Sequence, residues 1–252
     1  YASPTPVIGQ GRVVLHFGTY GTVCLDTTTT TPRWTRRDIN CDHIVGPGSS
    51  PVLYEDLLIF PVDGGDVQYV LALDKHSGKE AWKTTRSVDY RNLIPDFRKA
   101  FNTPLLVEAD GRTQLISAGA EAAMAYDPES GKELWRVRFN GFSSSSRPVA
   151  GGGMVLVPTG YGRLEILAVR TDGRHDVTDT HVAWSRFRNV PSTPSPLVID
   201  DLIYMVSDGG IATCLNLADG TELWKKRIGA EYSASLLHAD GRIYYFSREG
   251  KI

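Results

Sequence analysis

The sequence predicts an all-β protein, a β-propeller of four-stranded antiparallel blades, and evenly spaced tryptophans are the first reason. The five tryptophans of the 252-residue chain lie 40 to 53 residues apart, a period that is typical of propellers and solenoids. No stretch keeps a 3.6-residue apolar period, and short apolar runs bounded by turns precede the tryptophans, so the repeat unit consists of strands. The tryptophans are Trp34, Trp82, Trp135, Trp184 and Trp224.

A turn placed eight residues before four of these tryptophans is the second reason. In its clearest forms an Asp or Asn begins the turn and a glycine follows four residues later, as Asp74 and Gly78 do before Trp82. An Asp or Asn side chain can accept backbone N–H bonds across such a turn, and glycine takes the positive φ that closes a hairpin. The positions that begin these turns are Asp26, Asp74, Asp127 and Asn216.

The third repeat shows what one blade contains. Its apolar runs at 104–107, 113–117, 123–126 and 134–137 are separated by turns, which gives four short strands. Radially stacked four-stranded units of this size are propeller blades. The expected blades cover residues 3–40, 46–87, 100–140, 145–189 and 193–229, with part of a sixth at 232–252, all in a single domain.

The sixth blade has only two of its four expected strands. A sheet that stopped there would expose an apolar, unpaired edge, which stable proteins avoid. We therefore expect the chain to be a fragment of a propeller with seven or eight blades. The connection 90–100 is the only helix candidate, and Pro95 interrupts it.

Composition and charge exclude several classes of protein. Hydrophobic residues make up 41% of the chain and charged residues 22%, which are ordinary globular values. A formal net charge of -2 gives no basic excess, and the apolar runs are too short for a transmembrane helix. We therefore expect no nucleic-acid partner and no membrane insertion by this domain. The three cysteines lack zinc or redox spacing, and we expect neither a metal nor a cofactor.

The motif A-x-D-x-x-[ST]-G-x-x-x-W occurs most fully at Ala72–Trp82 and Ala125–Trp135. It resembles the tryptophan-docking repeat of the PQQ-type (quinoprotein-like, BamB-like) β-propellers of bacteria. The segments 46–52, 111–115 and 176–184 are similar to the PQQ-binding-like repeat proteins of that group. The resemblance implies an exported protein, periplasmic or extracellular, whose signal segment is not in this chain, and a protein or cell-envelope partner.

The quinone-dependent enzymes of that superfamily stack their cofactor between a tryptophan and a disulfide of adjacent cysteines, and hold Ca²⁺ with Glu, Asn and Asp oxygens. In this chain no two cysteines are adjacent, and every tryptophan occupies the repeat position. We therefore favour a non-catalytic scaffold that presents loops on one face to a protein, peptide or glycan. The alternative is a quinone- or Ca²⁺-dependent dehydrogenase, or a small-ligand binder, that uses the axial funnel.

The connections between blades and the turns between the second and third strands are expected to share one face, which is the usual functional face of propellers. The sequence places its longest irregular segments there, and long loops without secondary structure are uncommon unless they bind something or are disordered. Candidate binding residues in these segments are His43, Tyr90 and Arg98.

Alignment of the first strands predicts a ring of small residues around the central funnel, interrupted by one arginine. The aligned column contains Thr5, Ser50, Thr103, Arg147, Ser195 and Ala234. Arg147 would bring five donors and a fixed charge to a partly enclosed place, so we expect it to anchor an anion or carboxylate, supported by Asn102 and Ser146. The alternative is a salt bridge from Arg147 to Glu121 or Asp208.

Overall fold

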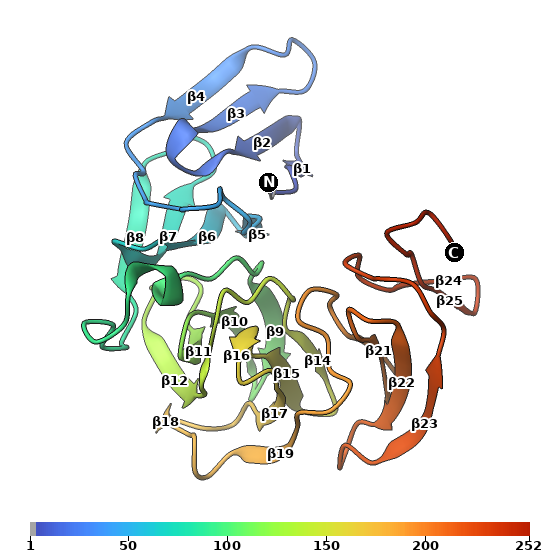
Figure 1. The fold of residues 1–252 in the computed structure, drawn as a ribbon. Helices are drawn as coiled ribbons and strands as arrows, with labels where there is room; N and C mark the ends of the chain where they lie inside the picture. Colours follow the sequence, from blue (N-terminus) through green and yellow to red (C-terminus); the bar gives the residue numbers. More distant parts are fainter. Residues whose placement is uncertain (1–3) are drawn as a thin grey trace.

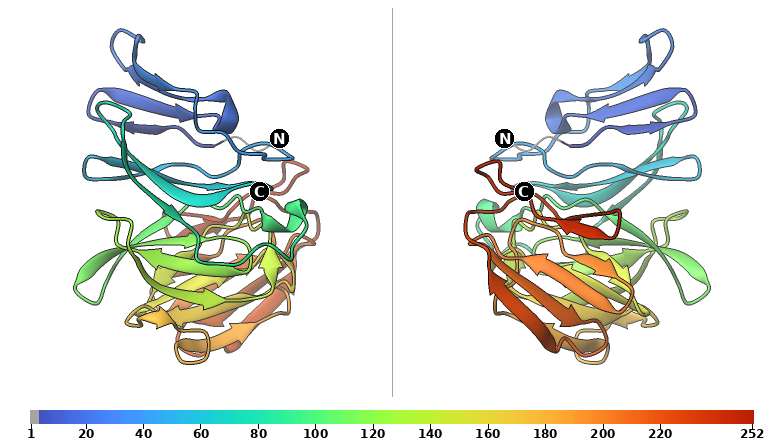
Figure 2. Two further views of the ribbon diagram at one scale, coloured as in Figure 1. Left: turned by 90° about the vertical axis from the view of Figure 1, so that its left-hand side faces the viewer. Right: turned by 90° about the vertical axis from the view of Figure 1, so that its right-hand side faces the viewer.

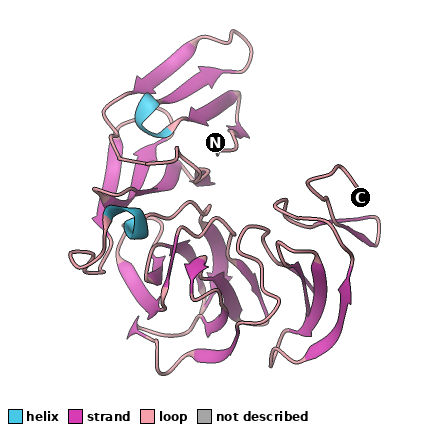
Figure 3. Ribbon diagram, in the orientation of Figure 1, coloured by secondary structure: helices cyan, strands magenta, loops and turns pink. Residues whose placement is uncertain are grey.

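The computed structural model describes residues 4–252, so residue 3, where the first blade is expected to begin, lies outside the described part. The all-β prediction is confirmed: the described residues form 25 strands and two one-turn 3₁₀ helices, η1 (Gly18–Tyr20) and η2 (Pro95–Arg98) (Figure 3). In the connection 90–100, only η2 is helical. It begins at Pro95, where a missing N–H costs nothing.

Four antiparallel strands in chain order make up each of the large sheets, and the third sheet has one additional strand. The first sheet contains β1 (Val7–Gly9), β2 (Arg12–His16), β3 (Thr22–Asp26) and β4 (Pro32–Arg36). The second contains β5 (Val52–Tyr54), β6 (Leu57–Asp63), β7 (Gln68–Asp74) and β8 (Glu80–Thr85). The third contains β9 (Leu105–Ala109), β10 (Arg112–Ala118), β11 (Ala122–Tyr126) and β12 (Glu133–Arg138).

The later sheets continue the pattern. The fourth contains β14 (Val149–Gly151), β15 (Met154–Pro158), β17 (Ile166–Arg170) and β19 (Val182–Arg186). The fifth contains β20 (Leu197–Ile199), β21 (Leu202–Val206), β22 (Ile211–Asn216) and β23 (Glu222–Arg227). A last pair is formed by β24 (Leu237–Ala239) and β25 (Arg242–Tyr244). Two short strands, β13 (Gly141–Phe142) and β16 (Tyr161–Gly162), pair with each other, and β18 (His175–Asp176) joins the third sheet.

The sheets follow one another around a common axis, with the first strand of each sheet innermost (Figure 1). Figure 2 shows the same succession from two sides. The core is divided into four apolar clusters, each of which lies between two neighbouring sheets. Each sheet therefore buries its faces against its neighbours in the arc, which is how radially stacked blades form a core.

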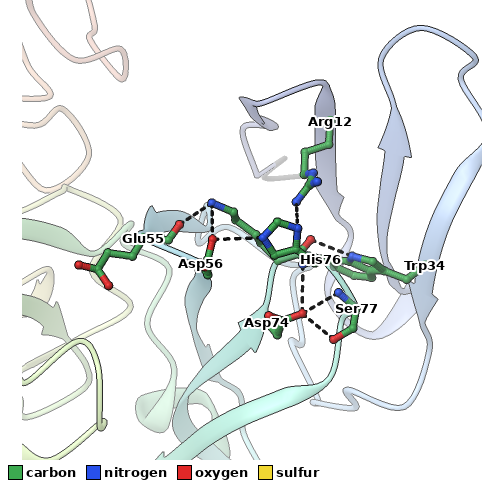
Figure 4. Close-up of polar contacts among 8 residues, drawn as sticks. Arg12, Trp34, Glu55, Asp56, Asp74, His76 and Ser77 are labelled. Carbon is green, nitrogen blue, oxygen red and sulfur yellow. Dashed lines mark hydrogen bonds and ion pairs between the residues drawn. The ribbon is translucent and has the colours of Figure 1, made fainter.

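Tryptophans on the outermost strands join one sheet to the next. Trp34, on β4, packs against Gly78 in the turn of the second sheet and donates its indole N–H to Lys75 O at 3.0 Å (Figure 4). Gly78 has φ +71°, and a Cβ there would lie 2.7 Å from the indole, so only glycine allows this approach. Trp82 packs in the same way on Gly131, and Trp184 on Gly220.

Asp74 begins the turn that receives Trp34. Its Oδ1 accepts the backbone N–H groups of His76 at 3.2 Å and Ser77 at 2.7 Å (Figure 4). A hydrogen bond from the Ser77 hydroxyl is the largest contribution that lowers the pKa of this carboxyl, which keeps it ionised as an acceptor. Asp26 and Asp127 each accept two backbone N–H groups in their turns, and Asn216 accepts one.

The fourth sheet departs from this pattern, because its last hairpin is longer. The inserted segment carries β18, which pairs in parallel with β12 and places His175 opposite Trp135. Trp135 is fully buried and donates to Gln114 Oε1 at 2.8 Å, instead of to a turn carbonyl. The third sheet therefore has five strands, where the repeat predicts four.

Trp224 corrects one expectation from the sequence. The tryptophan repeat predicts that Trp82, Trp135 and Trp224 are each buried between neighbouring blades, but Trp224 is 43% exposed. The buried tryptophans at this position are covered by the last hairpin of the following sheet. After the fifth sheet, the described residues form only the pair β24–β25, and that pair has no such hairpin to cover the indole.

Candidate functional site

Connections between sheets and the turns between second and third strands lie together, and we call this side of the molecule the loop face. The turn at Gly65 donates its N–H to Asp42 O at 2.9 Å, in the connection between the first and second sheets. The connection before β9 is tied to the one before β14 by a 2.8 Å bond from Phe101 N to Ser144 O. Backbone bonds of this kind hold the loops in one arrangement.

An axial cavity of about 450 Å³ opens where all six inner strands begin. Four backbone-to-hydroxyl bonds of 2.8 to 3.1 Å link its rim from sheet to sheet: Thr5 N to Ser50, Ser50 N to Thr103, Arg147 N to Ser195, and Ser195 N to Ser235. The rim residue of the last pair is Ser235, not Ala234 as the alignment suggested. We call the hydroxyl-bearing rim residues the hydroxyl ring: Thr5, Ser50, Thr103, Ser195 and Ser235.

Arg147 interrupts the hydroxyl ring. It stands where the other sheets carry Ser or Thr, and among residues 4–252 no hydroxyl bond links Thr103 to the fourth sheet. Its Nε donates at 3.2 Å to Pro104 O, directly before the neighbouring inner strand β9. The side chain lines the cavity and remains accessible to solvent. Desolvation by the surrounding rim lowers the pKa of the guanidinium, which nevertheless stays charged.

The alternative of a salt bridge to Glu121 or Asp208 is wrong. Within the described chain Arg147 has no carboxylate within salt-bridge distance. Asp208 instead accepts two 2.7 Å bonds, from the backbone N–H and the hydroxyl of Ser192. Glu121 lies in a turn of the third sheet, where desolvation raises its pKa.

Asn102 and Ser146 do not support Arg147 as expected. Both are fully buried, and both donate to backbone carbonyls: Asn102 Nδ2 to Ala118 O at 2.7 Å, and Ser146 Oγ to Pro194 O at 3.0 Å. These bonds fix the inner ends of the connections. The hydroxyls that surround Arg147 come from the ring itself and from Ser145, which also lines the cavity.

The other predicted binding residues mainly shape the loops. Tyr90 is buried and donates its hydroxyl to Ala120 O at 3.1 Å. Arg98 closes its own loop through Leu93 O, with Nε at 2.8 Å, and reaches Gly65 O at 3.4 Å. His43 is half-buried, with Nδ1 3.7 Å from Cys41 Sγ and no partner for Nε2 among the described residues.

Cys41 and His43 do not form an activated thiol. Burial, together with the neighbouring Asp66 carboxylate, raises the pKa of the Cys41 thiol to about 12. Desolvation also lowers the pKa of His43. A nucleophilic cysteine needs a lowered thiol pKa, so this pair is a packed contact in the first connection.

Three aromatic side chains form a ridge on the loop face that no sequence pattern predicted. The ring centroids of Phe97 and Phe142 lie 4.3 Å apart, and those of Phe142 and Tyr161 lie 6.5 Å apart. Phe142 and Tyr161 face each other across the β13–β16 pair. Tyr161 is 54% exposed, and the exposed Ile94 precedes η2 on the same connection as Phe97. We call Phe97, Phe142 and Tyr161 the aromatic ridge.

The opposite face has a larger cavity, of about 850 Å³, between the fourth and fifth sheets. Its rim consists of tight turns such as Gly152–Gly153, and its carboxylates include Asp110, which pairs with Arg174 at 3.2 Å.

No group of three potential metal-ligating side chains occurs among residues 4–252. The axial cavity has no acidic or aromatic lining, so it does not fit a stacked quinone with bound calcium.

A family model described as outer membrane protein assembly factor BamB matches residues 2–84, 66–230 and 178–252. The chain belongs to this family. BamB from Yersinia pestis is 24% identical over 234 residues, which cover 73% of this chain and 58% of that protein. The chain therefore spans less than two-thirds of this curated relative.

Solved structures show the same fold. BamB from Moraxella catarrhalis matches with a TM-score of 0.74 at 16% identity, over 97% of this chain and 69% of that one. A quinohemoprotein alcohol dehydrogenase from Pseudomonas putida HK5 matches with a TM-score of 0.66, also at 16% identity, over 90% of this chain and 42% of the enzyme. The BamB fold and the quinoprotein fold are both β-propellers, so the predicted fold class is confirmed.

Proposed function

We propose that this BamB-family chain is a non-catalytic scaffold of the cell envelope, on its periplasmic or extracellular side, that binds a protein partner through its loop face. The curated relative is an outer membrane protein assembly factor, which supports a protein partner in the envelope. No helix within residues 4–252 is long and apolar enough to cross a membrane. The observation that carries the proposal is the aromatic ridge.

The aromatic ridge has the properties of a binding hot spot. Aromatic side chains are enriched at the centres of protein interfaces, and rigid ones lose little entropy on binding. The β13–β16 pair fixes Phe142 opposite Tyr161, and a 2.8 Å bond from Ser143 N to Lys99 O ties this segment to the connection that carries Phe97. The ridge is therefore held in place before any partner arrives.

Photo-crosslinking in the envelope of the source cells tests the proposal. A photoreactive amino acid at Tyr161 is expected to crosslink a partner protein, whereas the same amino acid at the exposed Glu129, in a turn of the opposite face, is not. Tyr161→Ser is expected to weaken binding of the captured partner at least about tenfold.

Phe187→Ser provides the matched control, because Phe187 is 59% exposed but lies outside the aromatic ridge. This variant is expected to bind the partner with wild-type affinity. Phe187 follows β19 in a connection between sheets. Equal losses from Tyr161→Ser and Phe187→Ser would therefore contradict a specific role for the aromatic ridge, and equal crosslinking from Tyr161 and Glu129 would contradict binding through the loop face. We also infer that the contacts between outer-strand tryptophans and turn glycines act as the family's tryptophan-docking motif.

A further inference from the structure

Arg147 is a departure from the repeat, and its side chain makes one bond to the third sheet, from Nε to Pro104 O at 3.2 Å. At four rim positions, Ser50, Thr103, Ser195 and Ser235, a hydroxyl accepts the backbone N–H of the preceding sheet. At the fourth sheet an arginine takes this position and the link is lost. Positions that break a local rule are expected at functional or strained sites.

The guanidinium has unused donors. Only Nε has a protein acceptor, Pro104 O, and no residue within 4–252 accepts a hydrogen bond from Nη1 or Nη2. The Arg147 residue as a whole is exposed. Two parallel N–H donors in a fixed fork match the two oxygens of a carboxylate.

The surroundings favour a singly charged ligand with a small apolar part. Among residues 4–252, Arg147 is the only charged residue that lines the axial cavity. Hydroxyls of the ring already accept backbone N–H groups, so their own O–H groups are free to donate to an anion. Pro6, Val7, Pro51 and Val52 supply an apolar wall on the side of the first two sheets. One positive charge without further cations balances one carboxylate better than a phosphate dianion.

We propose that the axial cavity is a binding site for a monocarboxylate, which Arg147 Nη1 and Nη2 hold in a bidentate pair and the rim hydroxyls help to orient. The carboxylate belongs either to a free small acid or to the carboxyl terminus of a peptide. This site is separate from the aromatic ridge and does not rest on the proposed protein-binding role.

Calorimetric or NMR titration of the purified chain tests the site with three probes: butyrate, acetyl-trialanine with a free carboxyl terminus, and the same peptide as its C-terminal amide. The two acids are expected to bind saturably, with an affinity that falls as salt is added, and the amide is not. Tighter binding of the peptide acid than of butyrate identifies a chain terminus as the source, and equal binding identifies a free acid. Binding of the amide as strong as that of the acid overturns the proposal.

Two substitutions of Arg147 test whether binding needs the bidentate geometry of the guanidinium or only its positive charge. Arg147→Gln is expected to lower the affinity for both acids at least about tenfold, and Arg147→Lys to recover only part of it. Arg91→Gln is the control, because Arg91 is an exposed arginine of the loop face whose charge is paired with Asp89 at 2.6 Å.

The melting temperatures of all three variants are expected to match the wild type, because neither arginine is buried. Unchanged acid binding by Arg147→Gln, or a loss of equal size in Arg91→Gln, overturns the site. Tyr161→Ser is expected to bind the acids normally, so failure of the ridge proposal and failure of this one are distinguishable.

Discussion

Burial controls the protonation of His16 at the end of β2. The side chain is 5% exposed, its ring centroid lies 4.4 Å from that of Phe60, and Nδ1 is 2.8 Å from Thr22 Oγ1. Desolvation, together with a smaller contribution from the nearby His43, lowers the pKa of His16 from 6.5 to about 4. In the folded protein this imidazole is therefore neutral at pH values where a solvated histidine is charged.

This difference predicts an acid-sensitive stability. Between pH 6.5 and about 4 the unfolded chain binds a proton at His16 that the folded protein does not, so protonation favours unfolding. The free energy of unfolding is expected to fall by up to about 1.4 kcal/mol per pH unit as the pH decreases through this window. Urea unfolding at pH 7, 6 and 5 measures it.

His16→Gln keeps a polar side chain at this position but removes the titrating group, so its stability is expected to change less over the same window. His238→Gln is the control, since His238 is exposed. If His16→Gln and the wild type lose stability in parallel, His16 does not carry the effect. A steeper loss in His238→Gln would also contradict this explanation.

Among single residues, the sequence predicted those that follow the repeat register. The column of rim residues placed Arg147 correctly at the axial cavity, because each first strand begins at the same point relative to the axis. The partner of Arg147 was not predictable, since Asp208 is used by Ser192 in its own neighbourhood. Phe142 and Tyr161 were not predicted as site residues, because their contact depends on a pair of two-residue strands that no local pattern indicates.

At the scale of elements, the tryptophan of the outer strand and the last turn of the next sheet form the contact that connects two neighbouring sheets. The turn contributes a glycine in the left-handed region, an Asp or Asn that organises its backbone, and a carbonyl that accepts the indole N–H. Trp82 is 9% exposed in such a contact and donates to Pro128 O at 3.1 Å, whereas Trp224 is 43% exposed. The same residue type at the same repeat position thus occupies two environments.

This contrast gives a matched pair of substitutions. Trp82→Ala is expected to lower the free energy of unfolding by roughly 3 to 5 kcal/mol, the range for truncating a buried aromatic residue. Trp224→Ala is expected to cost about 1 kcal/mol or less, because much of the indole already contacts solvent. Chemical denaturation of both variants measures the difference. A cost for Trp224→Ala as large as that for Trp82→Ala would show that Trp224 is covered in solution.

The fourth sheet contains an insertion that imitates the spacing of the repeat. Asp176 stands eight residues before Trp184, the spacing of the turn residues elsewhere. In the structure the equivalent backbone bond begins at Arg170, whose N–H reaches His181 O at 3.0 Å, as Asp74 N reaches Lys79 O at 2.8 Å. Asp176 instead pairs with Arg138 at 2.9 Å, beside the third sheet. The inserted segment reproduces the eight-residue spacing by coincidence, so the sequence pattern does not distinguish Asp176 from a turn residue.

Across the whole molecule, stability is shared between neighbouring sheets. Each apolar cluster spans two consecutive sheets, as when Leu71 of the second sheet packs with Val14 of the first. A buried ion pair, Arg86 Nε with Asp63 Oδ1 at 2.6 Å, also links sheets, because Arg86 Nη2 donates to Ser117 Oγ at 2.9 Å. Interactions of this nearest-neighbour kind give the inner members of an array two supporting interfaces and the outer members fewer.

Hydrogen exchange is therefore expected to be graded along the arc. Peptides from β10, β11, β15 and β17 should keep their amide protons longest, since their residues are largely buried between neighbours on both sides. Peptides from β24 and β25 should exchange first, because those strands are mostly exposed. Trp135→Ala should reduce protection in the third and fourth sheets, whose shared cluster contains this indole, and leave β2 and β3 unchanged. Uniform protection along the chain, or an equal response of β2 and β3, would mean that the sheets unfold as one unit and that the divided core does not set local stability.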